Sequence, residues 1–212
     1  QRLTTTTANE GQPEWLPDGS GITYLKNIDG TTQVWSLNIV SKEEKQITNI
    51  TDGVDMYLIS PDMKHLLYVK RVKLDQTVND IHPDLPKANA RIETDLMYRH
   101  WNAWSDNSYN HIFVTPLIPN TLCSDGLDIL KDEKYHSPLM PFGGIEQISW
   151  TPDSKCIAYT CKKLYGLASA KSTNSDIYLH NITNGSVKNL TEGNMGYDMN
   201  PQFSADGKYM FY

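Results

Sequence analysis

The sequence predicts an all-β protein built from repeated short antiparallel sheets, and three observations support this prediction. The 212 residues include 12 Tyr, 5 Trp, 13 Gly and 11 Pro, a balance typical of many strands joined by many turns. Several short segments alternate apolar and polar residues, as half-buried strands do. Four segments also resemble one another, each with an apolar strand, a turn centred on aspartate and a second apolar strand.

The four turns share one chemistry. A proline in the first three presets φ for the second position of a tight turn, and the aspartate is placed to cap backbone N–H groups. A glycine in the first and last turns tolerates positive φ. The expected turn residues are Pro17, Asp18, Gly19, Pro61, Asp62, Pro152, Asp153, Asp206 and Gly207. The strands before the turns carry large apolar residues that are expected to pack between repeats, namely Trp15, Leu58, Trp150 and Phe203.

Two further strand-like segments follow each of the first three hairpins, so each complete repeat holds four short strands. These segments are 33–38 and 45–48, 111–116 and 127–131, and 176–181 and 187–191. The turn aspartates are separated by 44, 91 and 53 residues, and a four-stranded propeller blade takes about 40–50 residues. The sequence therefore predicts an incomplete β-propeller with about three four-stranded blades and the first hairpin of a fourth.

The long middle spacing has two interpretations: two blades, or one blade with an insertion. The excess length lies between two recognisable strands of one repeat, which favours an insertion within blade two at about 73–110. Residues 1–212 then form a partial propeller domain. Known propellers close with about four to eight blades, so we expect the chain to be part of a larger protein.

Composition excludes several function classes. The formal net charge is −6, which disfavours nucleic acid and anionic membranes as partners. No apolar run approaches the roughly 18 residues of a membrane span. The six histidines are scattered and each turn offers one carboxylate, so we expect no metal and no cofactor. Cys156 and Cys161 should lie on opposite faces of one strand and, with Cys123, remain free thiols.

The strand-turn units around Ser60-Pro61-Asp62 and Thr151-Pro152-Asp153 resemble the WD-like propeller repeats of TolB-like proteins and of prolyl oligopeptidase-family serine peptidases. The insertion narrows the resemblance. Its segment 93–106 (ETDLMYRHWNAWSD), followed by 111–114 (HIFV), is similar to the acylaminoacyl-peptidase and dipeptidyl-peptidase-five-like branch. The resemblance implies a propeller that caps a C-terminal α/β-hydrolase domain and limits which peptides reach its Ser-Asp-His triad.

This chain departs from that pattern because it has no G-x-S-x-G nucleophile elbow and no strand-helix alternation. The hydrolase domain is therefore expected outside this sequence, as a partner in the same polypeptide. We expect no catalytic residue in this chain and no activity from it alone. The full-length parent is expected to be a serine peptidase acting on short peptides.

The insertion is the expected site of function. Its apolar spacing permits a short helix, and Glu93, Asp95, Tyr98 and Arg99 lie close together in sequence. An ammonium ion needs carboxylate oxygens and an aromatic face around it, so this group could bind the amino terminus of a peptide. In the alternative interpretation Asp95 pairs with Arg99 on a solvated helix face, while Trp101 and Trp104 anchor the insertion on the blade.

The rival function is a TolB-like propeller that binds proteins or peptides as a scaffold without any catalytic domain. The resemblance to bacterial members implies a periplasmic or secreted protein, with the cytoplasm as the alternative. The incomplete propeller leaves an unpaired strand edge at about 200–212, so the isolated chain is expected to self-associate.

Overall fold

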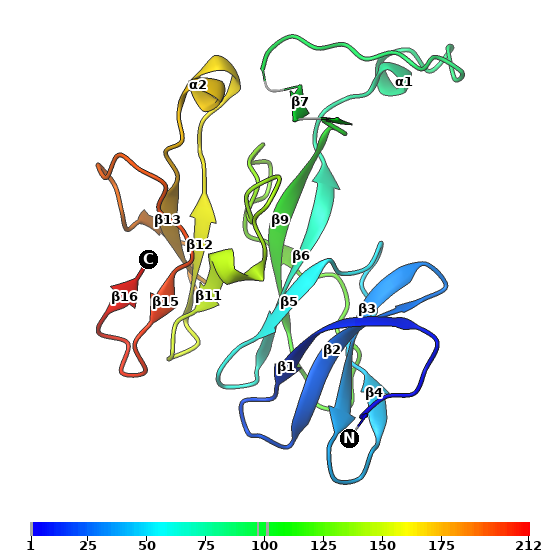
Figure 1. Ribbon diagram of the computed structural model, residues 1–212, viewed down its shortest axis with the longest axis vertical. Coiled ribbons are helices and arrows are strands. Elements are labelled where there is room, and N and C mark those ends of the chain that lie inside the picture. The colour runs from blue at the N-terminus through cyan, green and yellow to red at the C-terminus, as the bar shows by residue number, and fades with distance from the viewer. Residues whose placement is uncertain (1, 97, 101) are drawn as a thin grey trace.

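The computed structural model describes residues 2–96, 98–100 and 102–212. Its strands form three four-stranded antiparallel sheets that follow one another in chain order (Figure 1). Sheet 1 contains β1 (Asn9–Trp15), β2 (Gly21–Ile28), β3 (Thr31–Asn38) and β4 (Glu44–Gln46). Sheet 3 contains β11 (Ile148–Trp150), β12 (Cys156–Cys161), β13 (Asp176–Asn181) and β14 (Val187–Asn189).

Sheet 2 lies between them and carries the long insert. Its strands are β5 (Met56–Ile59), β6 (His65–Lys73), β9 (Ser108–Pro116) and β10 (Leu127–Asp128). β6 and β9 pair along their whole length, so residues 74–107 leave and re-enter the sheet at one end. We call residues 74–107 the insert; it contains α1 (Val78–Ile81) and a hairpin of β7 (Arg99–His100) and β8 (Ala103–Trp104).

The remaining elements are short. Sheet 4 is a hairpin of β15 (Gln202–Phe203) and β16 (Met210–Phe211), a 3-10 turn η1 (Ile145–Gln147) precedes β11, and α2 (Gly166–Lys171) connects β12 to β13. Three four-stranded sheets followed by a hairpin match the strand pattern predicted from the repeats. No helix in the described ranges is long and apolar enough to cross a membrane.

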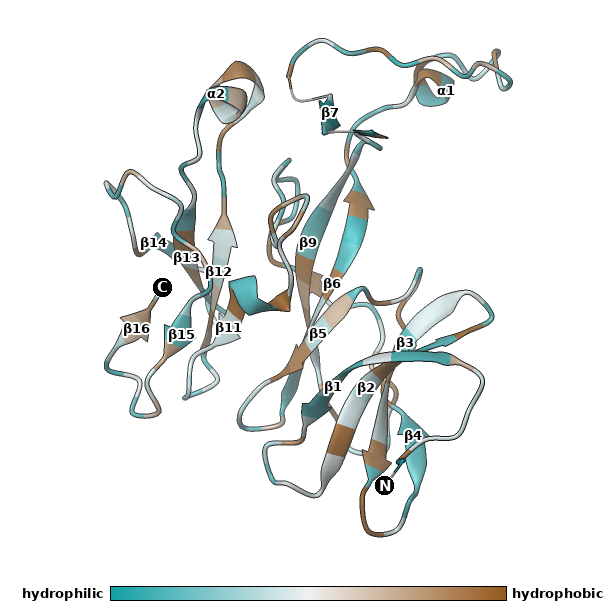
Figure 2. Ribbon diagram, in the orientation of Figure 1, coloured by the Kyte–Doolittle hydropathy of each residue, from teal (hydrophilic) through white to brown (hydrophobic). Residues whose placement is uncertain are grey.

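Because side chains alternate between the two faces of a strand, the middle sheet packs against both neighbouring sheets. On β6, Leu66 and Tyr68 join a buried cluster with Val34 of sheet 1, whereas Leu67 and Val69 join a second buried cluster with residues of sheet 3. Successive side chains on a strand point to opposite faces, so one apolar run serves two interfaces. Figure 2 shows apolar residues gathered on these central strands.

The observed register corrects one prediction. Four residues pair directly across the tight hairpins at equivalent positions: Trp15, Ile59, Trp150 and Phe203. Ile59 therefore takes the place predicted for Leu58, which sits one residue earlier and faces the opposite interface. Trp150 is buried against sheet 2. Trp15 is 67% exposed, contrary to prediction, because none of the described sheets packs on that face of sheet 1.

The four tight turns have the same backbone. Each turn aspartate accepts a hydrogen bond from the N–H two residues later, at 2.9 Å for Asp18 and 3.1 Å for Asp62, Asp153 and Asp206. The residue directly after the aspartate has positive φ in every turn, at 71° for Gly19, 57° for Met63, 61° for Ser154 and 69° for Gly207. Glycine thus marks only two of the four left-handed positions.

The three cysteines are free thiols. Cys156 and Cys161 lie on β12 five residues apart, and the alternation of a strand places them on opposite faces. Burial raises the pKa of Cys161 to about 12, so its thiol stays protonated at neutral pH.

Candidate functional site

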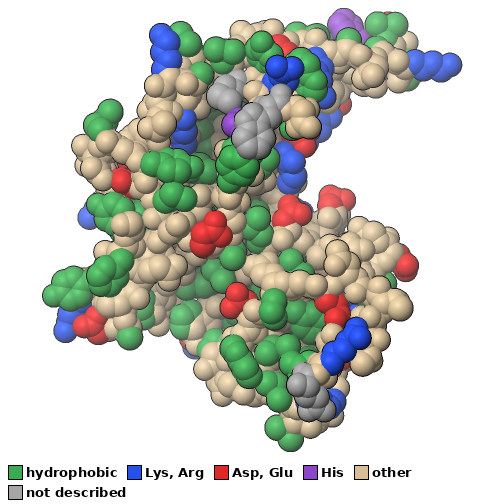
Figure 3. Space-filling view, in the orientation of Figure 1, with side chains coloured by type: hydrophobic (Ala, Val, Ile, Leu, Met, Phe, Trp, Pro, Cys, Tyr) green, Lys and Arg blue, Asp and Glu red, His purple; other side chains and the backbone are tan. Residues whose placement is uncertain are grey.

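Two connections extend from the same end of the row of sheets. The insert joins the second and third strands of sheet 2, and the loop with α2 joins the second and third strands of sheet 3. Figure 1 shows both rising from that end. In Figure 3 the insert projects beyond the sheets, and acidic side chains lie along the hollow between it and sheet 1. This end therefore carries the surface with the least regular structure, where binding residues often occur.

The insert contains an aromatic hairpin flanked by cations. The ring of Tyr98 stacks on Trp104 with centroids 5.9 Å apart. The guanidinium carbons of Arg91 and Arg99 lie 5.4 and 5.7 Å from the Trp104 ring centre. Arg91 also donates to the carbonyl oxygen of Ser105. Cation–π contacts of this kind hold both guanidinium groups on a partly exposed indole.

The short helix allowed by the sequence does not form. The segment before β7 is irregular, and Arg99 pairs across the hairpin with Trp104. Aromatic residues, Thr and Asn have weak helix propensity, and cross-strand stacking stabilises them in a hairpin instead. The predicted helical pairing of Asp95 with Arg99 is therefore wrong, and no ion pair joins them among the described residues. Trp101 of the alternative interpretation lies outside the described residues.

The structure separates the four predicted site residues. Tyr98 and Arg99 lie together at Trp104. The carboxyl of Asp95 lies instead against Gly166 of α2, and its Oδ1 accepts the N–H of Leu96 at 2.7 Å. Glu93 is exposed. Trp104, predicted as an anchor, is 48% exposed and packs within the hairpin itself.

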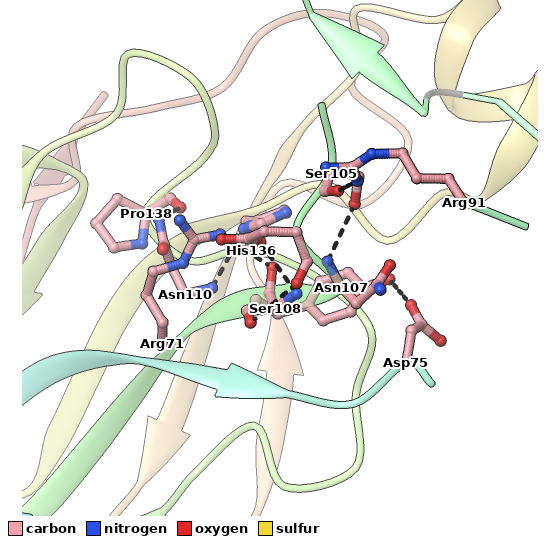
Figure 4. A network of polar contacts seen from close by, with 11 residues as sticks. Arg71, Asp75, Arg91, Ser105, Asn107, Ser108, Asn110, His136 and Pro138 are labelled. Atoms are coloured by element: carbon pink, nitrogen blue, oxygen red, sulfur yellow. Dashed lines mark hydrogen bonds and ion pairs between the residues drawn. The ribbon is translucent and has the colours of Figure 1, made fainter. Parts of the chain in front are cut away.

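A polar network holds the foot of the insert on sheet 2 (Figure 4). Arg71 Nη2 lies 2.6 Å from Asp106 Oδ1 and donates to the Ser108 carbonyl oxygen at 3.3 Å. Tyr109 donates its hydroxyl to Asp75 at 2.6 Å, and Lys134 contacts the other oxygen of Asp75 at 2.5 Å. Burial would raise the pKa of Asp75, but the bonds from Lys134 and Tyr109 outweigh it, and the pKa is lowered.

His136 joins this network from the loop after β10. Its Nδ1 accepts the backbone N–H of Asn110 at 3.2 Å, and its ring lies 5.0 Å from that of Tyr109. Asn110 also donates its side-chain amide to the Pro138 carbonyl oxygen at 3.1 Å. Burial, followed by the charge of Arg71, lowers the pKa of His136 to about 4. The imidazole is therefore neutral at neutral pH, with Nδ1 accepting and Nε2 carrying the proton.

A cavity of about 260 Å³ opens between sheet 1 and the segment leading to sheet 2. It is lined by Asn9, Glu10, Gly11, Leu25, Asn27, Thr32, Val54 and Asp55. Burial of its carboxyl raises the pKa of Asp55, although nearby Arg71 opposes the shift. Drug-sized ligands occupy about 300–1,000 Å³, so this cavity suits a smaller group such as the end of a peptide.

Sequence reasoning missed this cavity, because Glu10 and Asp55 lie 45 residues apart in segments that match no motif. The sequence shows only that one carboxylate, Glu10, lies on the first strand of sheet 1 and that another, Asp55, lies just before the first strand of sheet 2. Across the described ranges, no group of three or more His, Cys, Asp or Glu side chains is arranged to hold a metal ion.

Comparison with known proteins found relatives in sequence and in fold. No family model matches the chain. The sequence is 43% identical over 208 residues to dipeptidyl-peptidase 5 of Porphyromonas gingivalis, and 42% identical to the protein of that name from Porphyromonas endodontalis. Each alignment covers 98% of this chain and 30% of the relative. The chain thus spans about a third of the length of these relatives.

Solved structures share the fold at low sequence identity. TolB from Acinetobacter baumannii matches with a TM-score of 0.56 and 18% identity, covering 98% of this chain and 38% of TolB. An acylaminoacyl peptidase from Pyrococcus horikoshii matches with a TM-score of 0.55 and 15% identity, covering 86% of this chain and 25% of the peptidase. The resemblance to dipeptidyl-peptidase 5 is therefore confirmed in sequence, and the fold shared with TolB and the acylaminoacyl peptidase is confirmed in structure.

Proposed function

We propose that this chain is the propeller part of a serine dipeptidyl peptidase that acts on short peptides. The supporting observation is the 43% identity to dipeptidyl-peptidase 5 across nearly the whole chain, insert included. Peptide cleavage would use a serine nucleophile on an α/β-hydrolase domain outside this sequence. This chain contributes no nucleophile, since it has no G-x-S-x-G elbow.

The proposed task of the propeller is to limit access to the hydrolase. The insert and the α2 loop extend from the same end of sheets 2 and 3. A hydrolase domain that docks at this end would be reached only past these two connections. Peptides short enough to pass would be cleaved, whereas folded proteins would be excluded by size.

Recognition of the peptide amino terminus is a second part of the proposal. The ammonium ion requires carboxylates nearby. Arg91 and Arg99 repel a cation at the aromatic hairpin itself, which leaves Glu93 and Asp95 as the candidates within the insert. The cavity lined by Glu10 and Asp55 offers a second pair of carboxylates, of which Glu10 also lies 4.0 Å from Lys26 Nζ.

Chromogenic dipeptides with free or blocked amino termini test both candidate sites, the insert and the cavity. The assay uses the longer protein, which is the full-length parent with its proposed hydrolase domain. Asp55→Asn, Glu93→Gln and Asp95→Asn should each be compared with the parent. Substitution of a residue that binds the ammonium ion should lower kcat/KM for dipeptides with a free amino terminus by about tenfold or more. The reason is that a charge-assisted hydrogen bond contributes about 1.5–3 kcal/mol. Blocked dipeptides should be unaffected.

Asp84→Asn is the matched control, because Asp84 is an exposed carboxylate of the same insert. Equal kcat/KM values for all variants would exclude amine recognition by these residues. A longer protein that cleaves none of the peptides, with or without blocked ends, would favour the scaffold function. The likeness to TolB is consistent with that rival, although at 18% identity it shows only a shared fold.

A further inference from the structure

The insert of sheet 2 touches α2 of sheet 3 at one glycine. A Cβ atom added to Gly166 would lie 1.8 Å from Asp95 Oδ2 and 2.4 Å from Asp95 Cγ. Ordinary contacts of a Cβ atom are 3.4–4 Å. The carboxyl of Asp95 therefore occupies the space that any other residue at position 166 would fill.

We infer that Gly166 is a positioning residue that lets α2 hold the insert, so that the two connections form one arch across the junction of sheets 2 and 3. The insert depends on such a contact because its own structure is slight. Its helix α1 has four residues, and its hairpin strands have two residues each. Loops with few internal contacts open readily unless tertiary contacts hold them.

The contact is one of shape rather than charge. Asp95 Oδ1 is occupied by the N–H of Leu96 at 2.7 Å, which orients the carboxyl toward α2. Among the described residues no ion pair engages Asp95, and no hydrogen bond joins its carboxyl to α2. An asparagine at position 95 should therefore preserve the arch, whereas loss of the side chain should weaken it.

The consequence for substrates depends on the proposed function. If the insert and α2 line the path by which peptides reach the hydrolase domain, the arch sets the width of that path. Displacing it should admit longer peptides, so kcat/KM for these peptides should rise relative to that for dipeptides. Gly166 would then act on substrate length although it touches no substrate.

Hydrogen exchange of the longer protein tests the arch directly, without reference to activity. Gly166→Ala should speed exchange of backbone amides in residues 89–96 by about twofold or more, since the added methyl must displace the exposed Asp95 carboxyl. Gly185→Ala is the matched control, because Gly185 also has positive φ (71° against 51°) but meets nothing within 4 Å. It should leave those amides unchanged.

Variants at Asp95 complete the test and avoid strain in α2. Asp95→Ala alone should speed exchange of the insert, and Asp95→Asn should not. In the Asp95→Ala background, Gly166→Ala should add little, because the carboxyl it would strike is gone. The inference is overturned if Gly166→Ala acts no differently from Gly185→Ala, or if its effect is the same with and without the Asp95 carboxyl.

Activity then serves as a separate readout. With peptides of two to six residues, Gly166→Ala should raise the ratio of kcat/KM for the longer members to kcat/KM for dipeptides. No change in this length profile, with faster exchange confirmed, would refute the link from the arch to substrate length. A protein that cleaves no peptide refutes the proposed function, while the exchange data still decide whether the arch exists.

Discussion

Ser154 Oγ accepts a hydrogen bond from the backbone N–H of Asp62 at 3.0 Å, although 92 residues separate the two in sequence. Both residues belong to tight turns, and the bond joins the turn of sheet 3 to that of sheet 2. The equivalent residue of sheet 4 is Gly207, whose added Cβ would lie 4.0 Å from Pro152 of sheet 3. The turns of sheets 2, 3 and 4 therefore contact one another as well as closing their own hairpins.

Ser154→Ala should lower the free energy of unfolding by about 1 kcal/mol, the usual net value of one hydrogen bond. The reason is that Ser154 is buried and its hydroxyl is the partner of the Asp62 amide. Urea unfolding measures the change. Met63→Ala is the control, since Met63 has the same left-handed φ in the turn of sheet 2. The cross-sheet bond is unimportant if both substitutions cost the same.

Tyr57 provides a second link between sheets. Its fully buried hydroxyl donates to the Gln12 carbonyl oxygen at 3.0 Å and lies 2.9 Å from Thr23 Oγ1. Tyr57→Phe should cost about 1–2 kcal/mol, because the Gln12 carbonyl oxygen loses its donor and the buried Thr23 hydroxyl loses its acceptor. Tyr209→Phe, at a residue 66% exposed, should be neutral in the same unfolding assay. Equal stability of the Tyr57 variant and the parent would contradict this reading.

His136 should make stability depend on pH between about 6.5 and 4. Burial and then Arg71 lower its pKa to about 4 in the folded protein, against 6.5 for an unperturbed histidine. As pH falls through this window, the unfolded chain binds a proton that the folded protein does not. Stability therefore decreases on acidification, by as much as about 3 kcal/mol, and this contribution stops changing below pH 4.

Urea unfolding at several pH values would measure this slope. His136→Asn should reduce it, since the asparagine oxygen can still accept the Asn110 N–H without titrating in this range. His82→Gln, at an exposed position of the insert, is the control and should retain the slope. A slope that is unchanged in His136→Asn would assign the pH dependence to other groups. His180, whose pKa burial also lowers, would be examined next.

The isolated chain should self-associate through its last hairpin. Sheet 4 has two strands, and it exposes Tyr209 by 66% and Phe211 by 63%. Exposed apolar residues beside an unpaired strand edge favour pairing between chains. Light scattering should show mass increasing with concentration, and Phe211→Glu should suppress the increase. Val40→Glu changes the charge equally at a residue 91% exposed in sheet 1 and should not. A monomer at all concentrations would refute the prediction.

The candidate site was only partly predictable. The sequence located the insert between β6 and β9, because the spacing between two turn aspartates is longer there than one four-stranded repeat needs. It could not place the residues inside the insert. Tyr98 and Arg99 meet at Trp104 through a hairpin, whereas the same spacing also permits a helix. The cavity at Asp55 and the network of His136 join segments that are distant in sequence and share no motif.

The sequence by itself determined the repeating hairpins, because their causes are local. A proline, an aspartate that caps the amide two residues later and flanking apolar residues specify the same turn wherever they occur. Tertiary structure decided which faces those strands bury and which distant loops meet. Leu66 and Leu67 are adjacent and both apolar, yet they serve different interfaces. Asp95 lies against Gly166 only because packing of sheets 2 and 3 brings their connections together, and no local pattern encodes that distance.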